Sequence, residues 1–184
     1  MKKYEFTGKI KQYFGTTLRQ IVAVMDFGGI NAGDVGGWIE NENNLSHEGD
    51  AWVYGDAKVY GNAEVWGDAR VCGNAEVYGD AKVYGNAKVC GNAGVYVGNQ
   101  VLVIGAIGSR GGFTTFYRDK DNEITVKCGC FAGKIEEFLR KVSQTHGNNR
   151  HAMVYRAAAE LAKASIELSP EKNKKEGQPG TAGD

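Results

Sequence analysis

The stretch from Gly49 to Tyr96 reads GDAWVY GDAKVY GNAEVW GDARVC GNAEVY GDAKVY GNAKVC GNAGVY, which is eight six-residue units in a row. Every unit has Gly first, Asp or Asn second, Ala third and Val fifth. A short fixed period indicates units that are too small to bury their own apolar face and must stack on their neighbours. The stretch therefore predicts a solenoid.

The order of residues inside each unit predicts which side chains face the core. Ala and Val stand two positions apart, so a strand directs both to one face and the residues beside them to the other. Stacking buries one face of each short strand, which places Ala and Val inside. Gly followed by Asp or Asn suits the corner between strands, because these residues tolerate left-handed backbone angles.

The units resemble the hexapeptide repeat of left-handed parallel β-helices. In that family three units make one triangular turn, so each residue lies under the residue eighteen positions later. The resemblance implies a mainly β fold: a left-handed parallel β-helix with an N-terminal β cap and a C-terminal β-hairpin plus two α-helices. The inward spacing of six extends beyond the clean units, to Ile39 and Leu45 before them and to Val101 and Ile107 after them.

Composition along the chain divides it into four parts. We expect an N-terminal β cap at 1–30, the β-helix at 31–108, and a hairpin with a helical segment at 109–168. The polar end, 169–184, has few hydrophobic residues and is expected to be a disordered tail.

Local patterns place the elements of the flanking parts. Alternating or apolar runs predict a hairpin of 2–11 with 18–27, and a second hairpin of 113–118 with 123–128. Apolar residues at helical spacing and strong helix formers predict helices over 134–145 and 151–168.

A period of eighteen also predicts the outward columns of the coil. One column stacks Tyr54, Cys72 and Cys90, where we expect the two cysteines to pack as thiols. The other two columns are aromatic: Tyr60, Tyr78 and Tyr96 in one, and Trp66, Tyr84 and Leu102 in the other. Such columns exceed what a monomer surface normally exposes. They are interpreted either as stabilising ring ladders or as a homo-oligomer interface, and the resemblance implies a trimer.

Charge and cysteine content limit the possible partners and the cellular compartment. Lysine plus arginine equals aspartate plus glutamate, 22 each, so no bulk attraction to nucleic acid is expected. No apolar run approaches the ~18 residues that span a membrane, and the N-terminus lacks a secretory signal. The four cysteines do not form a secreted disulfide framework, which predicts a cytoplasmic protein with reduced thiols.

Catalysis is not the expected role. Hexapeptide acyltransferases, which the repeat also resembles, use a histidine near the coil, whereas Gly49–Tyr96 contains none and His47 lies at its edge. Cys128, Cys130, His146 and His151 are suitable zinc ligand types. However, Cys-x-Cys is unlike the usual Cys-x2-Cys spacing, so we expect neither metal nor cofactor.

The flanking stretches DFGGINAGDVGGWIENENNLSHEGDAWVYG and IGSRGGFTTFYRDKDNEITVKCGCFAGKIEEFLRKVSQTHGNN resemble uncharacterised hexapeptide-repeat proteins of bacteriophages and prophages. The resemblance implies a phage accessory protein in the host cytoplasm. We expect a non-catalytic oligomeric binding protein that sequesters a nucleotide-like small anion or blocks a host defence protein. Arginine suits phosphate recognition, and the candidate ligand-binding residues are Arg110, Thr114, Thr115, Arg118, His146 and Arg150.

Two alternatives remain open. The first is an acyltransferase-like enzyme that uses His47 or His146 in a groove between subunits. The second is a structural scaffold that assembles into an open array.

Overall fold

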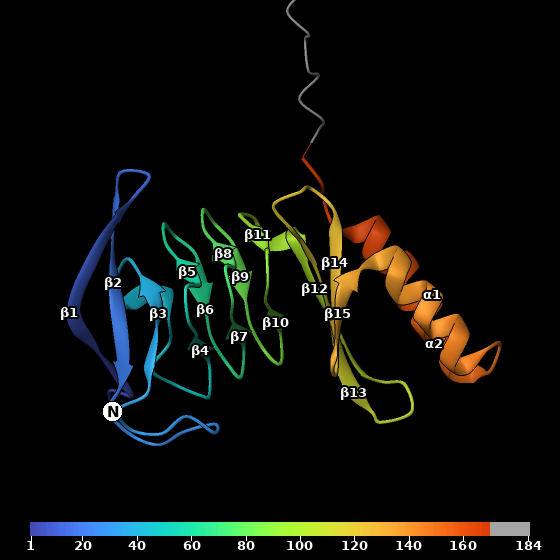
Figure 1. Ribbon diagram of the computed structural model, residues 1–184, viewed down its shortest axis with the longest axis horizontal. Coiled ribbons are helices and arrows are strands. Elements are labelled where there is room, and N and C mark those ends of the chain that lie inside the picture. Colours follow the sequence, from blue (N-terminus) through green and yellow to red (C-terminus); the bar gives the residue numbers. More distant parts are fainter. Residues whose placement is uncertain (170–184) are drawn as a thin grey trace, which may run out of the picture.

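The computed structural model describes residues 1–169. Three parts follow one another along the long axis of the molecule (Figure 1): N-terminal antiparallel strands, a parallel coil, and an antiparallel sheet backed by two helices. The expectation of a disordered tail falls outside the described residues, apart from Ser169.

The coil is made of two-residue strands, one from each repeat unit. They form three parallel columns: β4–β7–β10, β5–β8–β11 and β6–β9. Each residue pairs with the residue eighteen positions later, for example Trp52 with Arg70. The coil has about three turns and fits a left-handed β-helix, so the predicted fold class is confirmed. The strands are β4 (Trp52–Val53), β5 (Lys58–Val59), β6 (Glu64–Val65), β7 (Arg70–Val71), β8 (Glu76–Val77), β9 (Lys82–Val83), β10 (Lys88–Val89) and β11 (Gly94–Val95).

The repeated Ala and Val form the core of the coil. All of them are at most 1% exposed. The rungs are joined by backbone hydrogen bonds, such as that from the Trp52 N–H to the Ala69 carbonyl at 3.0 Å. Burial of one valine side chain contributes about 1.5–3 kcal/mol, so the stacked interior is the main source of stability in this part.

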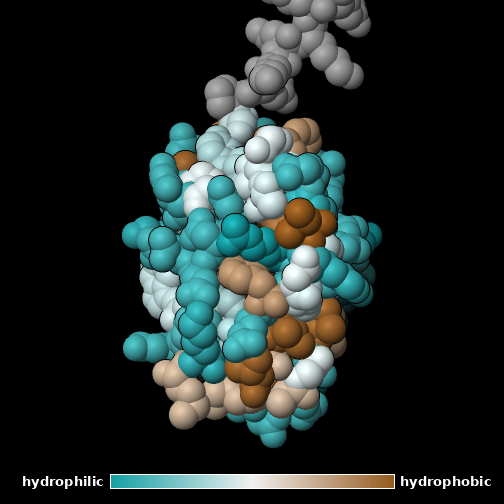
Figure 2. Space-filling view, turned by 90° about the vertical axis from the view of Figure 1, so that its left-hand side faces the viewer, coloured by the Kyte–Doolittle hydropathy of each residue, from teal (hydrophilic) through white to brown (hydrophobic). Residues whose placement is uncertain are grey.

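The N-terminal strands continue one column of the coil. Strands β1 (Tyr4–Tyr13) and β2 (Thr16–Ala23) form the expected antiparallel hairpin, and β3 (Val35–Ile39) pairs with β2 on one side and in parallel with β5 on the other. Figure 2 views the molecule from this end, where hydrophilic residues surround small hydrophobic patches. The exposed apolar residues of this part include Ile10, Phe14, Val24 and Val35.

The C-terminal sheet lies between the coil and the helices (Figure 1). It has the order β12–β13–β14–β15, and every pair is antiparallel. Its outer face packs on the helices through a second apolar core that includes Phe116, Val126 and Phe138. The elements are β12 (Val101–Ile107), β13 (Gly112–Arg118), β14 (Ile124–Cys128), β15 (Phe131–Lys134), α1 (Ile135–His146) and α2 (Arg150–Ser165).

Strand β13 and the turn after it satisfy the backbone groups of the last rung. The Lys88 N–H donates to the Thr115 hydroxyl at 3.0 Å. The Tyr117 hydroxyl donates to the Cys90 carbonyl at 2.9 Å, and the Arg118 guanidinium to the Gly94 carbonyl at 2.7 Å. An unpaired sheet edge is open to association with another chain. These contacts therefore terminate the coil.

The third outward column ends sooner than expected. Val101 and Ile107 are expected to keep the inward register of the coil, and Leu102 is expected to stack on Tyr84. Instead residues 101–107 form β12, which pairs antiparallel with β13, and Leu102 pairs with Phe116. The regular corner is lost just before this strand, because Val97 stands where the period of six requires Gly and the next Gly-Asn pair, Gly98-Asn99, comes one position late.

Cys72 and Cys90 form a disulfide, so the expectation that they pack as reduced thiols was wrong. They occupy the same outward position on adjacent rungs, and their Cα atoms lie 4.5 Å apart. That separation is within the range of about 4.4–6.8 Å that a disulfide bridges. The stacking that aligns the repeats thus also aligns the two sulfur atoms. Cys128 and Cys130 are free.

Two corner glycines offer a matched test of the stacking. Gly49 and Gly55 both have positive φ, +66° and +59°. A Cβ on Gly49 would lie 2.6 Å from the Gly67 carbonyl oxygen on the next rung, whereas a Cβ on Gly55 meets no atom within 4 Å. We expect Gly55→Ala to lose about 1–2 kcal/mol from the left-handed backbone alone. Gly49→Ala should lose about 1–3 kcal/mol more, because its new methyl clashes with the next rung. Urea unfolding of both variants measures this, and equal losses would contradict the stacking geometry.

Candidate functional site

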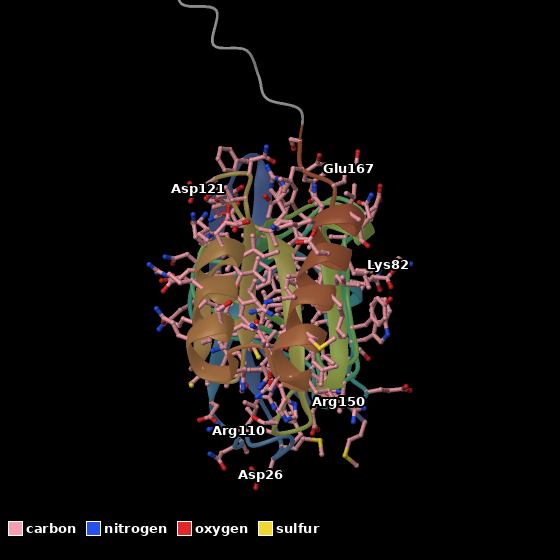
Figure 3. All side chains as sticks on the ribbon, turned by 90° about the vertical axis from the view of Figure 1, so that its right-hand side faces the viewer. Asp26, Lys82, Arg110, Asp121, Arg150 and Glu167 are labelled. Atoms are coloured by element: carbon pink, nitrogen blue, oxygen red, sulfur yellow. A yellow bond between two sulfur atoms is a disulfide. The ribbon has the colours of Figure 1, made fainter. Side chains whose placement is uncertain are left out.

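A cavity of about 300 Å³ opens between the C-terminal sheet and the helices. Two turns, β12–β13 and β14–β15, form one side of it, and α1 with Tyr155 of α2 forms the other. Figure 3 shows α1 and α2 in front of the sheet, with Arg110 at the end of the molecule where α2 begins. The lining residues are Ser109, Arg110, Gly112, Phe113, Cys128, Gly129, Cys130, Phe131, Phe138, Lys141, Val142, Thr145, His146 and Tyr155.

Aromatic rings make the apolar wall of the cavity. Phe138 is nearly buried, and its ring centroid lies 5.6 Å from that of Phe131 and 5.5 Å from that of Tyr155. The Tyr155 and Phe138 rings meet edge to face, an arrangement that stabilises aromatic pairs. The wall is thus held by its own packing and does not need a ligand to form.

The Cys128 thiol and the Tyr155 hydroxyl line the cavity, and the buried Thr114 hydroxyl contacts the thiol. The Thr114 hydroxyl donates to the Cys128 sulfur at 3.2 Å, and the Cys128 thiol lies 3.9 Å from the Tyr155 hydroxyl. Burial, with the neighbouring Cys128, raises the pKa of Tyr155 to about 12. Tyr155 therefore presents a neutral hydroxyl at physiological pH. Gly108 has φ +74°, and a Cβ there would overlap the Tyr155 hydroxyl, so only glycine fits beside it.

Two basic side chains and a histidine lie on the rim of the cavity. Arg110 comes from the β12–β13 turn, and Lys141 and His146 come from α1. Within residues 1–169 none of the three makes an ion pair. The Lys141 ammonium lies 5.8 Å from the centre of the Phe131 ring, and the His146 ring centre lies 5.8 Å from that of Tyr155. Positive groups thus border aromatic surface, which suits an anion attached to an apolar or aromatic body.

The structure brings together only some of the residues that the sequence singled out for ligand binding. Arg110 and His146 line the cavity. Thr114 and Thr115 are each 1% exposed; Thr114 bonds Cys128, while Thr115 caps the coil. Arg118 lies 5.5 Å from the Tyr96 ring centre and bonds the last rung, and Arg150 opens α2 outside the lining.

Sequence reasoning missed Phe131, Lys141 and Tyr155 as lining residues. Phe131 and Tyr155 carry the apolar signal of ordinary core residues. Lys141 is adjacent to Val142 on α1, so helical spacing alone would have placed it at the edge of the apolar face.

The zinc alternative does not assemble. Cys128, Cys130 and His146 all border the cavity, but His151 does not line it. Across residues 1–169, no three His, Cys, Asp or Glu side chains are placed to hold one metal ion.

His47 lies in the N-terminal part, and its position in the sequence is distant from the residues that line the cavity. Its ring stacks on Tyr4 with centroids 4.2 Å apart, and its Nδ1 accepts from the Lys3 N–H at 3.3 Å. Burial lowers the pKa of His47. These contacts describe a packed residue of the cap.

The two aromatic columns differ in exposure. Tyr60, Tyr78 and Tyr96 are stacked and half-buried, and the Tyr13 ring covers Tyr60 at 6.0 Å. Trp66 and Tyr84 also stack, with centroids 4.9 Å apart, but Tyr84 remains 57% exposed. The column of Tyr60, Tyr78 and Tyr96 is therefore partly covered by its own chain, whereas Tyr84 in the column of Trp66 and Tyr84 faces outward.

No described helix has the length and apolar character needed to cross a membrane. No family model matches the chain. An Escherichia coli (strain K12) protein described as "Uncharacterized acetyltransferase YdcK" is 51% identical over 37 residues. The match covers 20% of this chain and 11% of that protein. It is thus a local similarity, about as long as two turns of the coil.

Lys3, beside His47, gives a pH-dependent test of the N-terminal cap. Its ammonium donates to the Gly49 carbonyl at 3.0 Å and lies 5.0 Å from the Phe27 ring centre. Burial lowers the pKa of Lys3 to about 8, against 10.5 ordinarily. Between these values the unfolded chain binds more protons than the folded one, so this group makes stability rise with pH across that window.

We therefore expect the stability advantage of the wild type over Lys3→Met to grow between pH 8 and 10. Urea unfolding at several pH values measures it, with Lys9→Met on the exposed face of β1 as the control. A wild-type advantage that stays constant over this range would contradict the buried position of Lys3.

Proposed function

We propose that this chain is a non-catalytic oligomeric binding protein that holds a small anionic ligand in the cavity beside α1. The observation that supports it is the combination, in one cavity, of an aromatic wall with two cationic side chains, Arg110 and Lys141, and with His146. The coil supplies a rigid base, and its last rung is bonded to the sheet that bears the cavity.

The dimensions of the cavity favour a small ligand. Its volume is about 300 Å³, at the lower end of the range of about 300–1,000 Å³ that is typical of small-molecule sites. Phe131, Phe138 and Tyr155 suit an aromatic or apolar body, and Arg110 with Lys141 suits a phosphate or carboxylate. A nucleotide-like ligand of the size of a nucleoside monophosphate fits this description.

The lack of hydrogen bonds to two polar side chains of the cavity, within the described part of the chain, favours ligand binding over catalytic turnover. The side chains of Cys130 and His146 have no hydrogen-bond partner among residues 1–169 that would orient them. Covalent catalysis requires a nucleophile and a base held by a third group. In a phage setting, the same cavity would remove a nucleotide-like signal from the host.

A second candidate function, acyl transfer, is supported by the local similarity to the protein described as an acetyltransferase. His146 is the histidine that would serve as base, because it borders the cavity whereas His47 is packed on Tyr4. Hydrolysis or transfer of acetyl groups from acetyl-CoA that is abolished by His146→Ala, and not by His47→Ala, would replace the binding proposal with this one.

Binding of aromatic anions tests the main proposal. Anilinonaphthalene sulfonate and AMP should bind to the folded protein without turnover. We expect Arg110→Ala and Lys141→Ala each to weaken binding about tenfold, because a charge-assisted hydrogen bond contributes about 1.5–3 kcal/mol. Arg140→Ala, on the exposed side of α1, is the matched control. Equal affinity in all four proteins, measured by fluorescence and calorimetry, would place binding elsewhere.

The exposed Trp66–Tyr84 ladder is proposed as the subunit interface of a closed trimer. Tyr84→Glu puts a charge on this surface and should convert the trimer to monomer in size-exclusion chromatography with light scattering. Lys9→Glu on the N-terminal hairpin should leave the mass unchanged. A trimer that persists in Tyr84→Glu would exclude this face as the interface.

A further inference from the structure

An open groove of about 520 Å³ lies on the first outward column of the coil, away from the cavity of the helices. Its floor is the Cys72–Cys90 disulfide, which joins the rungs that carry Arg70 and Lys88. Lys127 of β14 borders its C-terminal end. The remaining lining residues are Asp50, Tyr54, Asp68 and Asn86.

The first column differs from the others in its charge pattern. In the second column Lys58 pairs in register with Glu76, and in the third Glu64 pairs with Lys82. In the first column Arg70 pairs with Lys88, which sets two positive charges on adjacent rungs. Like charges directly opposite one another in a sheet are destabilising. Three basic residues, Arg70, Lys88 and Lys127, line the groove against two acidic ones, Asp50 and Asp68.

The N-terminal half of the groove holds both of its carboxylates, Asp50 and Asp68, together with Arg70. The Arg70 guanidinium donates to the Gly28 carbonyl and to the Tyr54 hydroxyl, so its position is fixed. Asp50 and Asp68 both act on buried Lys3, where they favour its charged form. The two carboxylates of the groove thus face cations of the same half.

Among the residues that the structure describes, no carboxylate lines the C-terminal half of the groove. Within residues 1–169 neither Lys88 nor Lys127 makes an ion pair. Thr115 links the two: its hydroxyl accepts from the Lys88 N–H at 3.0 Å, and its backbone pairs in register with Lys127. The backbones of the two lysines therefore lie close together where the coil joins the sheet, and both lysines line the groove, as does Asn86 of the same repeat unit as Lys88.

We propose that this groove is a second ligand site, in which Lys88 and Lys127 bind an oxyanion group, phosphate or a phosphate monoester. The anion offsets the two positive charges, and its other oxygens are within the reach of an amide donor such as Asn86. The disulfide floor keeps the Arg70 and Lys88 rungs in register. The site shares no residue with the cavity, so it does not depend on the function proposed for that cavity.

Titration with inorganic phosphate, followed by phosphorus NMR line width and calorimetry, tests the site. We expect Lys88→Gln and Lys127→Gln each to weaken phosphate binding about fivefold or more. Lys82→Gln changes the same position of the preceding repeat unit on another face, and it should leave binding unchanged. Circular dichroism and urea unfolding verify that the variants fold.

Two outcomes would overturn the proposal: no phosphate binding to the wild type, or equal binding by Lys88→Gln, Lys127→Gln and the wild type. A loss in Arg110→Ala alone would assign the phosphate to the cavity instead. Phenyl phosphate distinguishes the sources of the anion. Tighter binding than that of inorganic phosphate would indicate an ester whose organic part contacts Tyr54, and equal binding would indicate the free anion.

Discussion

The hydrogen bonds between rungs, together with the Ala and Val columns that they align, are the constraint on which the rest of the molecule depends. Each rung is too short to be stable alone, and each Val is buried only because the next rung covers it. Register must therefore hold at every turn. A shift of one residue would turn the apolar side chains outward and the charged ones inward.

A stacked coil exposes unpaired backbone groups at both ends, and the flanking parts of this chain bond to those groups. At the start, β3 supplies a parallel partner for β5, and the β1–β2 hairpin continues the sheet. At the end, Thr115, Tyr117 and Arg118 bond the backbone of the last rung. The sheet that carries these residues also bears one wall of the cavity and one end of the groove. Both proposed sites are thus built by the element that closes the coil.

The coil could be predicted from the sequence because the same pattern recurs in every unit. The inward Ala and Val follow from the spacing inside each unit. The period of eighteen, which places Lys58 beside Glu76, is what the resemblance to the hexapeptide repeat implies. The structure confirms both. It also placed both hairpins and both helices near their positions.

The single, unrepeated features were harder to predict. To predict the disulfide, one must know that the same position on two adjacent rungs comes within bridging distance. Only one pair of stacked cysteines occurs in the coil, so no repeated pattern indicates it. Thr115 and Arg118 resembled ligand residues because their role in closing the coil depends on how β13 packs on the last rung. Arg110 and Lys141 are 31 positions apart in the chain, and only the packing of α1 on the sheet brings them to one cavity.

The most direct test of the account is a native mass spectrum of the protein purified gently from cells, at low salt and without reductant. We predict a closed oligomer that carries extra mass in proportion to its subunits, lost on denaturation, with the mass of the released species identifying a small anion. The Arg110→Ala variant should give the same oligomer with that mass reduced or absent. An oligomer of bare mass from the wild type, or equal retention by the variant, would contradict a ligand held in the cavity beside α1.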